Sequence, residues 1–132
     1  MLYVNSLEEL VNSTPHAIGA ILVDWEGEAV QEFCHCDSYE IRFMAAHQAI
    51  ILSRLKELHA NMLNQSPVED FVVTVANAHL IIGCIDEDYS LLLCVDRKCP
   101  AQLALHNFRK SVLALRKEIW WNSRRKRAFS RD

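Results

Sequence analysis

The stretch from Asp37 to Leu63 reads DSYEIRFMAAHQAIILSRLKELHANML, and it decides the fold of this chain. It contains no Gly and no Pro, and it is rich in Ala, Leu, Met, Glu and Lys, which lose little conformational freedom in a helix. Asp37 followed three residues later by Glu40 fits a capping box, so the start of the helix is marked as well as its interior. The stretch predicts one long helix of roughly 40 Å at about 1.5 Å per residue, long enough to extend beyond a small domain.

Two apolar stripes run along this predicted helix on opposite sides. The broad stripe, which suits packing on a sheet, contains Ile41, Met44, Ala45, Ile51, Leu52, Leu55, Leu58, Met62 and Leu63. The narrow stripe contains Phe43, Ala46 and Ile50 at spacings i, i+3 and i+7. Either another segment of the same chain covers the narrow stripe, or it forms a contact between two copies of the helix. We favour the second interpretation, because exposed apolar patches on soluble proteins usually mark an interface.

The length and composition describe one globular domain. A chain of 132 residues, 51% of them hydrophobic, is long enough to bury about two-thirds of its extended-chain surface without disulfides. No basic residue precedes the first apolar segments, and no apolar run approaches the roughly 20 residues that span a bilayer. We therefore expect a cytoplasmic protein without a transmembrane segment.

The cysteines are expected to be reduced thiols, since an odd number in an unexported chain argues against a disulfide framework. They are Cys34, Cys36, Cys84, Cys94 and Cys99. The run Cys34-His35-Cys36 invites a zinc interpretation, but it lacks a second ligand pair at finger-like spacing. On a strand, His35 would also point away from the two thiols. We interpret the run as a strand end with two small apolar thiols, and we expect no metal and no cofactor.

Charge is distributed unevenly along the chain. Residues 1–41 contain eight acidic residues and no Lys or Arg, whereas residues 122–132 carry five basic residues against Asp132. We therefore divide the chain into a domain at residues 1–121 and a basic tail at residues 122–132. Such a tail is suited to nucleic acid or to an anionic membrane surface. We favour a frayed, solubilising terminus that folds back onto the acidic body, and we expect no nucleic-acid partner.

The N-terminal third predicts a helix and a hairpin. Ser6 with Glu9 is a second capping-box pattern, which opens a short helix that ends before Pro15. Apolar runs at 17–23 and 28–33 then predict two strands, and Gly27 supplies the positive φ of a tight turn between them. The charges on the second strand, Glu28 and Glu32, are typical of a sheet edge.

Three more strands and a helix follow the long helix, which ends around residues 64–67. The strands are predicted at 71–76, 79–85 and 89–95, and the short links between them allow only an antiparallel meander. Pro100 is well placed as the first residue of a helix whose apolar stripe continues to Ile119. The order is αββαβββα, an α+β fold with a five-stranded antiparallel sheet. The long central helix is expected on one face and the terminal helices on the other.

The residues show no catalytic constellation, and we expect no enzyme activity. The glycines are scattered and form no phosphate-binding loop, so the chain is not itself a GTPase. Cys84 and Cys94 lie in the middle of predicted strands, where a thiol is more often part of the core than a nucleophile. His47 and His59 lie twelve positions apart on the long helix, too far apart to hold one ion together.

Three stretches, in this order of elements, resemble the roadblock / dynein light chain seven family. Residues 19–27, GAILVDWEG, look like the first hairpin of the family. Residues 37–49 look like the start of its long helix, with an acidic residue at the cap and small residues inside. Residues 80–95 look like its last two strands. The resemblance covers roughly residues 5–120, and the basic tail has no obvious family equivalent.

The resemblance implies a homodimer and a GTPase partner. Family members pair their third strands edge to edge and stack their long helices, which would place Phe43, Ala46, Ile50, Phe71, Val73 and Val75 at the interface. Prokaryotic stand-alone members bind Ras-like small GTPases, and a gliding-motility member accelerates GTP hydrolysis. Arg42 and Arg54 are the candidate GTPase contacts, with a solvated surface charge as the alternative for each.

Two mechanisms and three functions stay open at this point. An activator inserts an arginine beside the phosphates, or it binds the GTPase conformation whose own residues are already positioned; we favour the second. The chain is a GTPase regulator, the interpretation we favour, or a structural light chain or scaffold subunit without effect on GTP hydrolysis. The third possibility is a small-molecule or metal sensor that uses the sheet and the cysteines.

Overall fold

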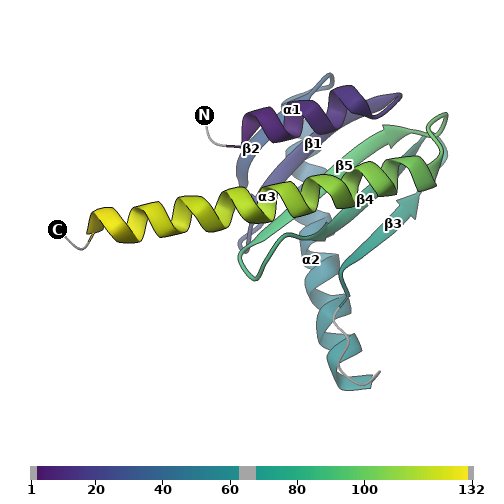
Figure 1. The fold of residues 1–132 in the computed structure, drawn as a ribbon. Coiled ribbons are helices and arrows are strands. Elements are labelled where there is room, and N and C mark those ends of the chain that lie inside the picture. The colour runs from purple at the N-terminus through teal and green to yellow at the C-terminus, as the bar shows by residue number, and fades with distance from the viewer. Residues whose placement is uncertain (1–2, 63–67, 131–132) are drawn as a thin grey trace.

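The computed structural model describes residues 3–62 and 68–130 of the 132 residues. The elements follow the predicted order αββαβββα (Figure 1): α1 (Val4–Ser13), β1 (Ala17–Asp24), β2 (Ala29–Cys34), α2 (Ser38–Met62), β3 (Asp70–Thr74), β4 (Ala78–Cys84), β5 (Tyr89–Asp96) and α3 (Ala101–Ser130). The fold class and the element order are therefore confirmed.

The five strands form one antiparallel sheet in the order β2-β1-β5-β4-β3. The inner strands β1 and β5 pair in one register from Asp24 with Tyr89 to Gly19 with Cys94, and the register then shifts so that Ala17 pairs with Val95. Their residues are apolar on both faces, as strands covered on both sides must be. The edge position expected for the second strand is confirmed, and β3 forms the opposite edge.

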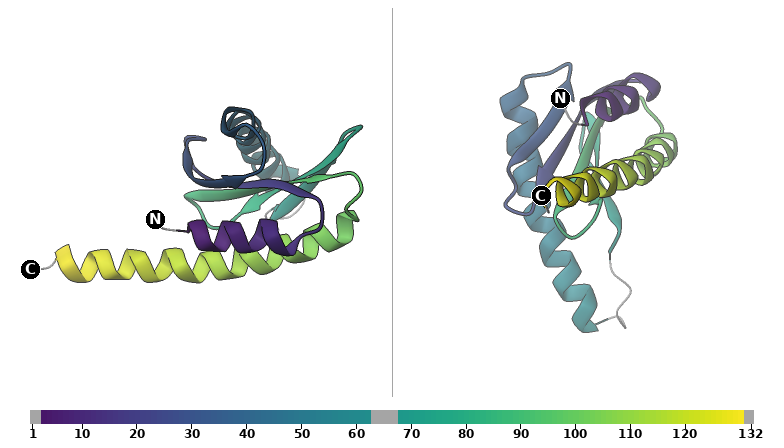
Figure 2. Two further views of the ribbon diagram at one scale, coloured as in Figure 1. Left: turned by 90° about the horizontal axis from the view of Figure 1, so that it is seen from above. Right: turned by 60° about the vertical axis from the view of Figure 1, so that its left-hand side comes forward.

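Helices cover both faces of the sheet, as predicted. Figure 2 shows α1 and α3 side by side in one layer and α2 on the other side of the sheet. Alternation along β1 explains the arrangement, because Ala20 and Leu22 pack toward α1 and α3 while Ile21 and Val23 pack toward α2. On the first face, the fully buried Phe108 of α3 lies in a core cluster shared with α1 and the sheet.

The start of α2 lies where the cap was predicted. The Asp37 carboxylate Oδ1 accepts a hydrogen bond from the backbone N–H of Tyr39 at 2.9 Å, which is the geometry of an N-cap side chain. The last turns of α2 extend beyond the sheet (Figure 1), as its length predicted. Gly27, in the turn between β1 and β2, has the expected positive φ of 84°.

The inward stripe of α2 is narrower than predicted. Ile41, Ala45 and Leu52 are buried, but Ile51 is 44% exposed and lies outside the core. The reason is geometric, because one straight helix contacts a twisted sheet along a narrow line and residues at the side of the stripe turn outward. Leu58, Met62 and Leu63 were also predicted to point inward, but they lie outside the residues whose side chains the structure describes.

The start of α1 differs from the prediction. The helix begins at Val4 rather than at Ser6, and its N-cap residue Tyr3 has a left-handed backbone with no side-chain cap. Ser6 lies inside the helix, where its hydroxyl donates to Glu118 Oε2 of α3 at 2.8 Å. Packing of Tyr3 and Leu7 into the core therefore sets the start of this helix, and the capping-box prediction was wrong.

The C-terminal helix is the longest element. It begins at Ala101, directly after Pro100, and continues across residue 121 to Ser130. The predicted apolar stripe was Ala101, Leu105, Phe108, Val112, Leu115 and Ile119. Ala101 and Leu105 are half-buried, whereas its last four members, which end at Ile119, are buried. Beyond this point α3 projects away from the sheet (Figures 1 and 2), so the basic residues after residue 121 lie on a helix up to Ser130.

Candidate functional site

The β3 edge of the sheet has its outer side open. Two backbone hydrogen bonds bracket the pairing with β4, from the N–H of Cys84 to the C=O of Glu69 at 3.0 Å and from the N–H of Val75 to the C=O of Ala78 at 2.9 Å. Antiparallel ladders alternate between bonded and non-bonded pairs, so the backbone groups of Val72 and Thr74 point to the outer side. Residues 71–77 carry no charged side chain. From residue 71 to residue 77 this edge presents N–H and C=O groups without a charged side chain, and the one charge of the strand, Asp70 at its start, is paired with Arg109.

The outward face of α2 is apolar over much of its length. Phe43 is 56% exposed and Ile50 is 61% exposed, on the side turned away from the core. The Phe43 ring lies between Tyr39, with ring centroids 6.3 Å apart, and His47, with centroids 4.4 Å apart. With the exposed Ile51, these side chains form the α2 surface, which we define as Tyr39, Phe43, His47, Ile50 and Ile51.

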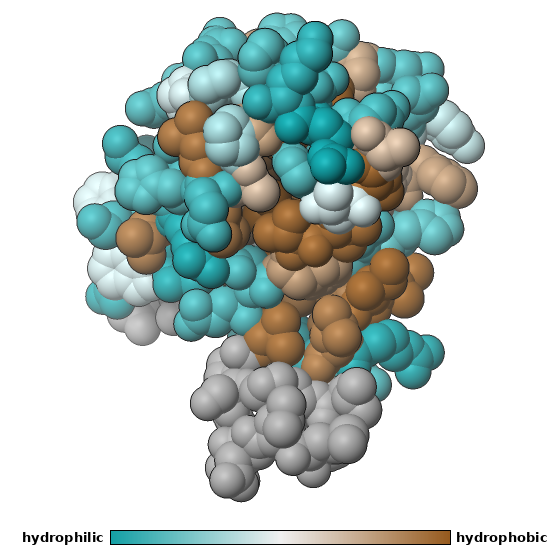
Figure 3. Space-filling model, turned by 90° about the vertical axis from the view of Figure 1, so that its right-hand side faces the viewer, coloured by the Kyte–Doolittle hydropathy of each residue, from teal (hydrophilic) through white to brown (hydrophobic). Residues whose placement is uncertain are grey.

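The interface residues inferred from the resemblance differ in their surroundings. Ala46 is half-buried and lies close to Gly27, whose hairpin covers this side of α2. Phe71 and Val73 are half-buried and pack toward the α2 face, whereas Val75 is exposed. Figure 3 faces the β3 side of the molecule and shows hydrophobic residues gathered over its centre and lower half. The structure thus places Phe43, Ile50 and Val75 at the surface and the other three partly below it.

Charged side chains lie at the β2 edge, which distinguishes it from the β3 edge. Glu32 accepts two hydrogen bonds of 2.7 Å from Nε and Nη2 of Arg42, so the guanidinium and the carboxylate form a fork between β2 and α2. Hydrogen bonding to Glu32 raises the pKa of Arg42 further above its ordinary value. Arg42 is therefore held beside β2. Arg54 differs, because its side chain is 79% exposed and has only a 3.9 Å ion pair with Glu57.

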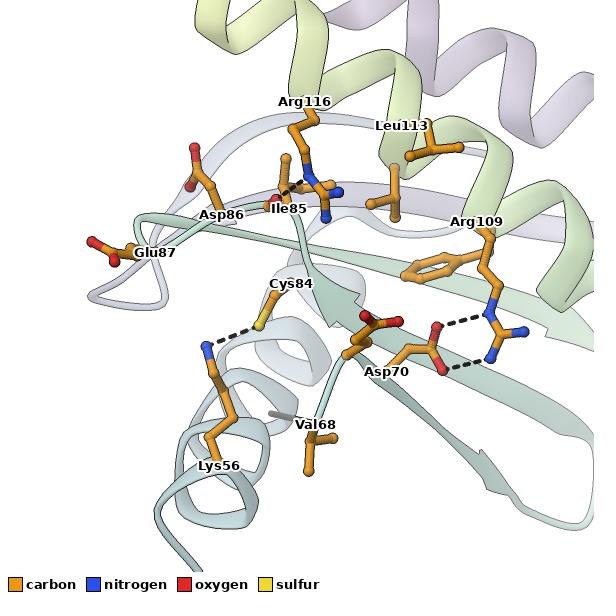
Figure 4. A pocket seen from close by; sticks show the side chains of 13 residues that line it. Lys56, Val68, Asp70, Cys84, Ile85, Asp86, Glu87, Arg109, Leu113 and Arg116 are labelled. Atoms are coloured by element: carbon orange, nitrogen blue, oxygen red, sulfur yellow. Dashed lines mark hydrogen bonds and ion pairs between the residues drawn. The ribbon is translucent and has the colours of Figure 1, made fainter. Parts of the chain in front are cut away.

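A cleft of about 520 Å³ lies where β3 begins, between the ends of β4 and α2 and the middle of α3 (Figure 4). Arg109 forms a two-pronged ion pair with Asp70, at 2.9 and 3.1 Å, and Arg116 donates to the C=O of Ile85 at 2.8 Å. Lys56 Nζ lies 3.0 Å from Cys84 Sγ. The Arg109–Asp70 ion pair thus holds the start of β3 against α3. Sequence reasoning missed these contacts, because partners up to 39 positions apart leave no local pattern.

Two of the thiols, Cys36 and Cys94, have pKa values raised by burial. Burial, reinforced by the neighbouring Cys34, raises the pKa of Cys36 to about 11, and burial raises the pKa of Cys94 to about 11. Thiols with raised pKa values are poor nucleophiles and poor metal ligands at neutral pH. In the part of the chain that the structure describes, no three His, Cys, Asp or Glu side chains are grouped so that they could hold a metal ion.

Among the helices within residues 3–62 and 68–130, none has the length and apolar character needed to cross a membrane. Comparison of the sequence with family models and with curated proteins gave no match.

Solved structures do match. A roadblock/LC7 domain from Streptomyces avermitilis superposes with a TM-score of 0.82 at 18% identity, covering 91% of this chain and 99% of that one. The gliding protein MglB from Thermus thermophilus superposes with a TM-score of 0.77 at 20% identity, covering 86% and 85% of the two chains. A further MglB structure, described as having a tetrameric arrangement, matches equally well. The chain therefore has the roadblock/LC7 fold that its sequence resembles.

Proposed function

We propose that this protein is a homodimeric, non-enzymatic regulator that binds a Ras-like small GTPase in the cytoplasm. The proposal has two parts, a dimer formed by the β3 edge and the α2 surface, and a GTPase partner bound by that dimer. The first part rests on surfaces of this chain. The second rests on the resemblance set out above and on the shared fold.

One observation carries the dimer. Two surfaces of the described residues can serve as an interface: the β3 edge, which carries no charge from residue 71 to residue 77, and the apolar α2 surface. Figure 3 shows hydrophobic residues gathered on the β3 side. An antiparallel strand pair is self-complementary about a two-fold axis, so β3 can pair with the same strand of a second copy. Such pairing extends the sheet across both copies and brings their α2 helices together on one face. The tetrameric arrangement of the matching MglB structure supports self-association of this fold.

The GTPase partner is favoured by the likeness to the gliding protein MglB, because the family that the sequence resembles includes a gliding-motility member that accelerates GTP hydrolysis. Arg42 is held by Glu32, so an inserted arginine would have to come from Arg54 or from a rearranged Arg42. Binding of a GTPase conformation whose own residues are already positioned needs neither change, and we favour this mechanism. A structural scaffold subunit without effect on hydrolysis is the alternative.

Light scattering tests the dimer. We expect the parent protein to have the mass of two chains and the Phe43→Asp/Ile50→Asp protein to have the mass of one, because each new carboxylate would be buried unpaired in the interface. A matched control is Leu113→Asp, an equally exposed apolar residue on the other face of the sheet, which should stay dimeric. A parent of single-chain mass, or a double variant that stays dimeric, would contradict the proposed interface.

Titration with purified Ras-like GTPases of the same organism tests the second part. We expect the dimer to bind a GTPase carrying a non-hydrolysable GTP analogue at least about tenfold more tightly than the GDP form, the difference that a state-selective binder must have. Arg54→Ala should change the hydrolysis rate of the complex less than about twofold. A loss of a thousandfold or more would instead identify an inserted arginine, and tight binding with unchanged hydrolysis would favour the scaffold.

A further inference from the structure

The projecting part of α3 carries a surface outside the proposed dimer interface. Among the side chains of α3 that the structure describes, Ile119 is the last buried one, and those from Trp120 to Arg125 are exposed or half-buried. Asn122 is tied to the body by a 3.3 Å hydrogen bond to the Tyr3 hydroxyl. Figures 1 and 2 show this end of α3 passing beyond α1 and the sheet.

The outward side of this segment combines aromatic and basic residues. Trp120 and Trp121 are both exposed, and with Arg116 and Lys117 they line a shallow, mainly apolar hollow. Leu113, Lys117, Trp120 and Arg124 recur at spacings that place them on one side of a helix. The Arg124 guanidinium lies 4.8 Å from the centroid of the Trp120 ring, a cation–π contact. We define the α3 surface as Leu113, Lys117, Trp120, Trp121, Arg124 and Arg125.

The charge of this region is opposite to that of the rest of the chain. Nine of the 14 Lys and Arg residues lie between Arg109 and Arg131, where the one acidic residue is Glu118. Glu118 faces α1, where it accepts the hydrogen bond from Ser6, so it does not neutralise the outward side. The formal charge of the whole chain is nevertheless −3. A basic helix on an acidic body has a field directed toward an anionic partner.

We propose that the α3 surface binds an anionic lipid membrane, with α3 lying along the headgroups rather than crossing the bilayer. Helices with Lys or Arg beside Trp and Leu bind at the membrane surface, because indole rings favour the boundary between lipid headgroups and acyl chains. The alternative of single-stranded nucleic acid is less well supported, because proteins bind single strands in concave basic grooves lined by stacking aromatics. The α3 surface is the outside of a projecting helix, and Leu113 offers no stacking face.

The proposed dimer would strengthen this binding. Antiparallel pairing of the β3 strands leaves both copies of α3 on the same face of the joined sheet, so two such surfaces face one membrane. This added avidity rests on the proposed function, whereas binding of a single α3 surface does not. The monomeric Phe43→Asp/Ile50→Asp protein should therefore bind vesicles more weakly than the parent without losing binding.

Vesicle co-sedimentation tests the proposal. We expect the full chain to bind phosphatidylcholine vesicles that contain phosphatidylserine, to leave pure phosphatidylcholine vesicles unbound, and to release the former as salt is raised. Arg124→Gln/Arg125→Gln should bind roughly 30-fold more weakly, from about 1 kcal/mol for each basic residue. Trp120→Ala/Trp121→Ala should lose at least about tenfold. The matched control is Arg54→Gln/Lys98→Gln, two exposed basic residues outside the α3 surface, which should bind as the parent does.

A second readout needs no change to the α3 surface. In Trp25→Phe protein the remaining indoles are Trp120 and Trp121, and their fluorescence should shift to shorter wavelength when phosphatidylserine vesicles are added. Three results would overturn the proposal. They are no shift and no sedimentation at low salt, equal loss of binding in the control pair, and binding to a single-stranded oligonucleotide without binding to vesicles.

Discussion

The two edges of the sheet, β2 and β3, differ in how they meet solvent. The β2 edge carries the Arg42–Glu32 fork and has Glu28 in the turn before it, and its register with β1 shifts between Leu22 and Val23. The β3 edge pairs with β4 without a shift from Asp70 to Thr74 and carries no charge from residue 71 to residue 77. Charges and bulges are the usual devices that keep an edge from pairing with another strand.

We infer from this difference that a partner covers the β3 side. An edge without charges, in a molecule that also exposes an apolar helix surface, is an aggregation hazard unless a partner occupies it. Because β2, the other edge of the same sheet, is protected by charges and a register shift, the lack of such protection at β3 is a local feature. It is the basis of our proposal that β3 pairs with a second copy of the chain.

Val72→Pro should have the largest effect. The N–H of Val72 points to the outer side of β3, so proline there removes an outward donor while leaving the hydrogen bonds to β4 intact. We expect light scattering to show a folded protein with the mass of one chain. At the same chain concentration, its melting temperature should be lower than that of the parent dimer.

Two substitutions separate the backbone effect from the side-chain effect. Val72→Ala keeps the outward N–H and should remain dimeric, with a dissociation constant raised less than about tenfold. Val30→Lys changes the exposed valine of the β2 edge, which is 40% exposed against 38% for Val72, and should not alter the mass. A dimer that persists in Val72→Pro, or that is lost in Val30→Lys, would assign the interface to a different edge.

Gly83→Ala should have an intermediate effect, by moving β3 without changing its outward groups. A Cβ at this position would lie 2.7 Å from the C=O oxygen of Glu69 and 2.9 Å from the Cβ of Asp70, so the start of β3 must shift. We expect the free energy of unfolding to fall by about 2 kcal/mol, the typical cost of an overpacked site. Denaturant unfolding measures this loss. An unchanged unfolding midpoint would mean that β3 is not held tightly at its start.

Glu32→Val/Arg42→Leu should have the smallest effect. It removes the fork from the β2 edge and so makes this edge more like β3, without touching the proposed interface. We expect a minor species larger than the dimer that grows with protein concentration, measured by analytical ultracentrifugation. A purely dimeric double variant at high concentration would indicate that the neighbouring helices, and not the charged fork, protect β2.

Much of the fold was predictable because its signals are local. The Asp37 cap, the turn at Gly27 and the apolar run of β1 each depend on a few adjacent residues, and each lies where the sequence indicated. The start of α1 was not predictable in this way. Contacts of Tyr3 and Leu7 with distant elements override the capping pattern at Ser6.

The interaction surfaces were predictable only in outline. The helical period identified Phe43 and Ile50 as outward residues, since that depends on one element. It did not identify the cover that the Gly27 hairpin places beside Ala46, nor the outward turn of Ile51, which depend on how α2 crosses the sheet. The fork that holds Arg42 joins two elements and has no signal in either alone.

Hydrogen–deuterium exchange of the two edge strands tests the central claim most directly. The experiment compares the amides of Val72 and Thr74 on β3 with that of Glu32 on β2, in concentrated parent protein and in the Phe43→Asp/Ile50→Asp variant. We predict slow exchange at Val72 and Thr74 in the parent and fast exchange in the variant, with Glu32 the same in both. Equally fast exchange of both β3 amides in the two proteins would show that β3 is an open edge in solution and would contradict the dimer.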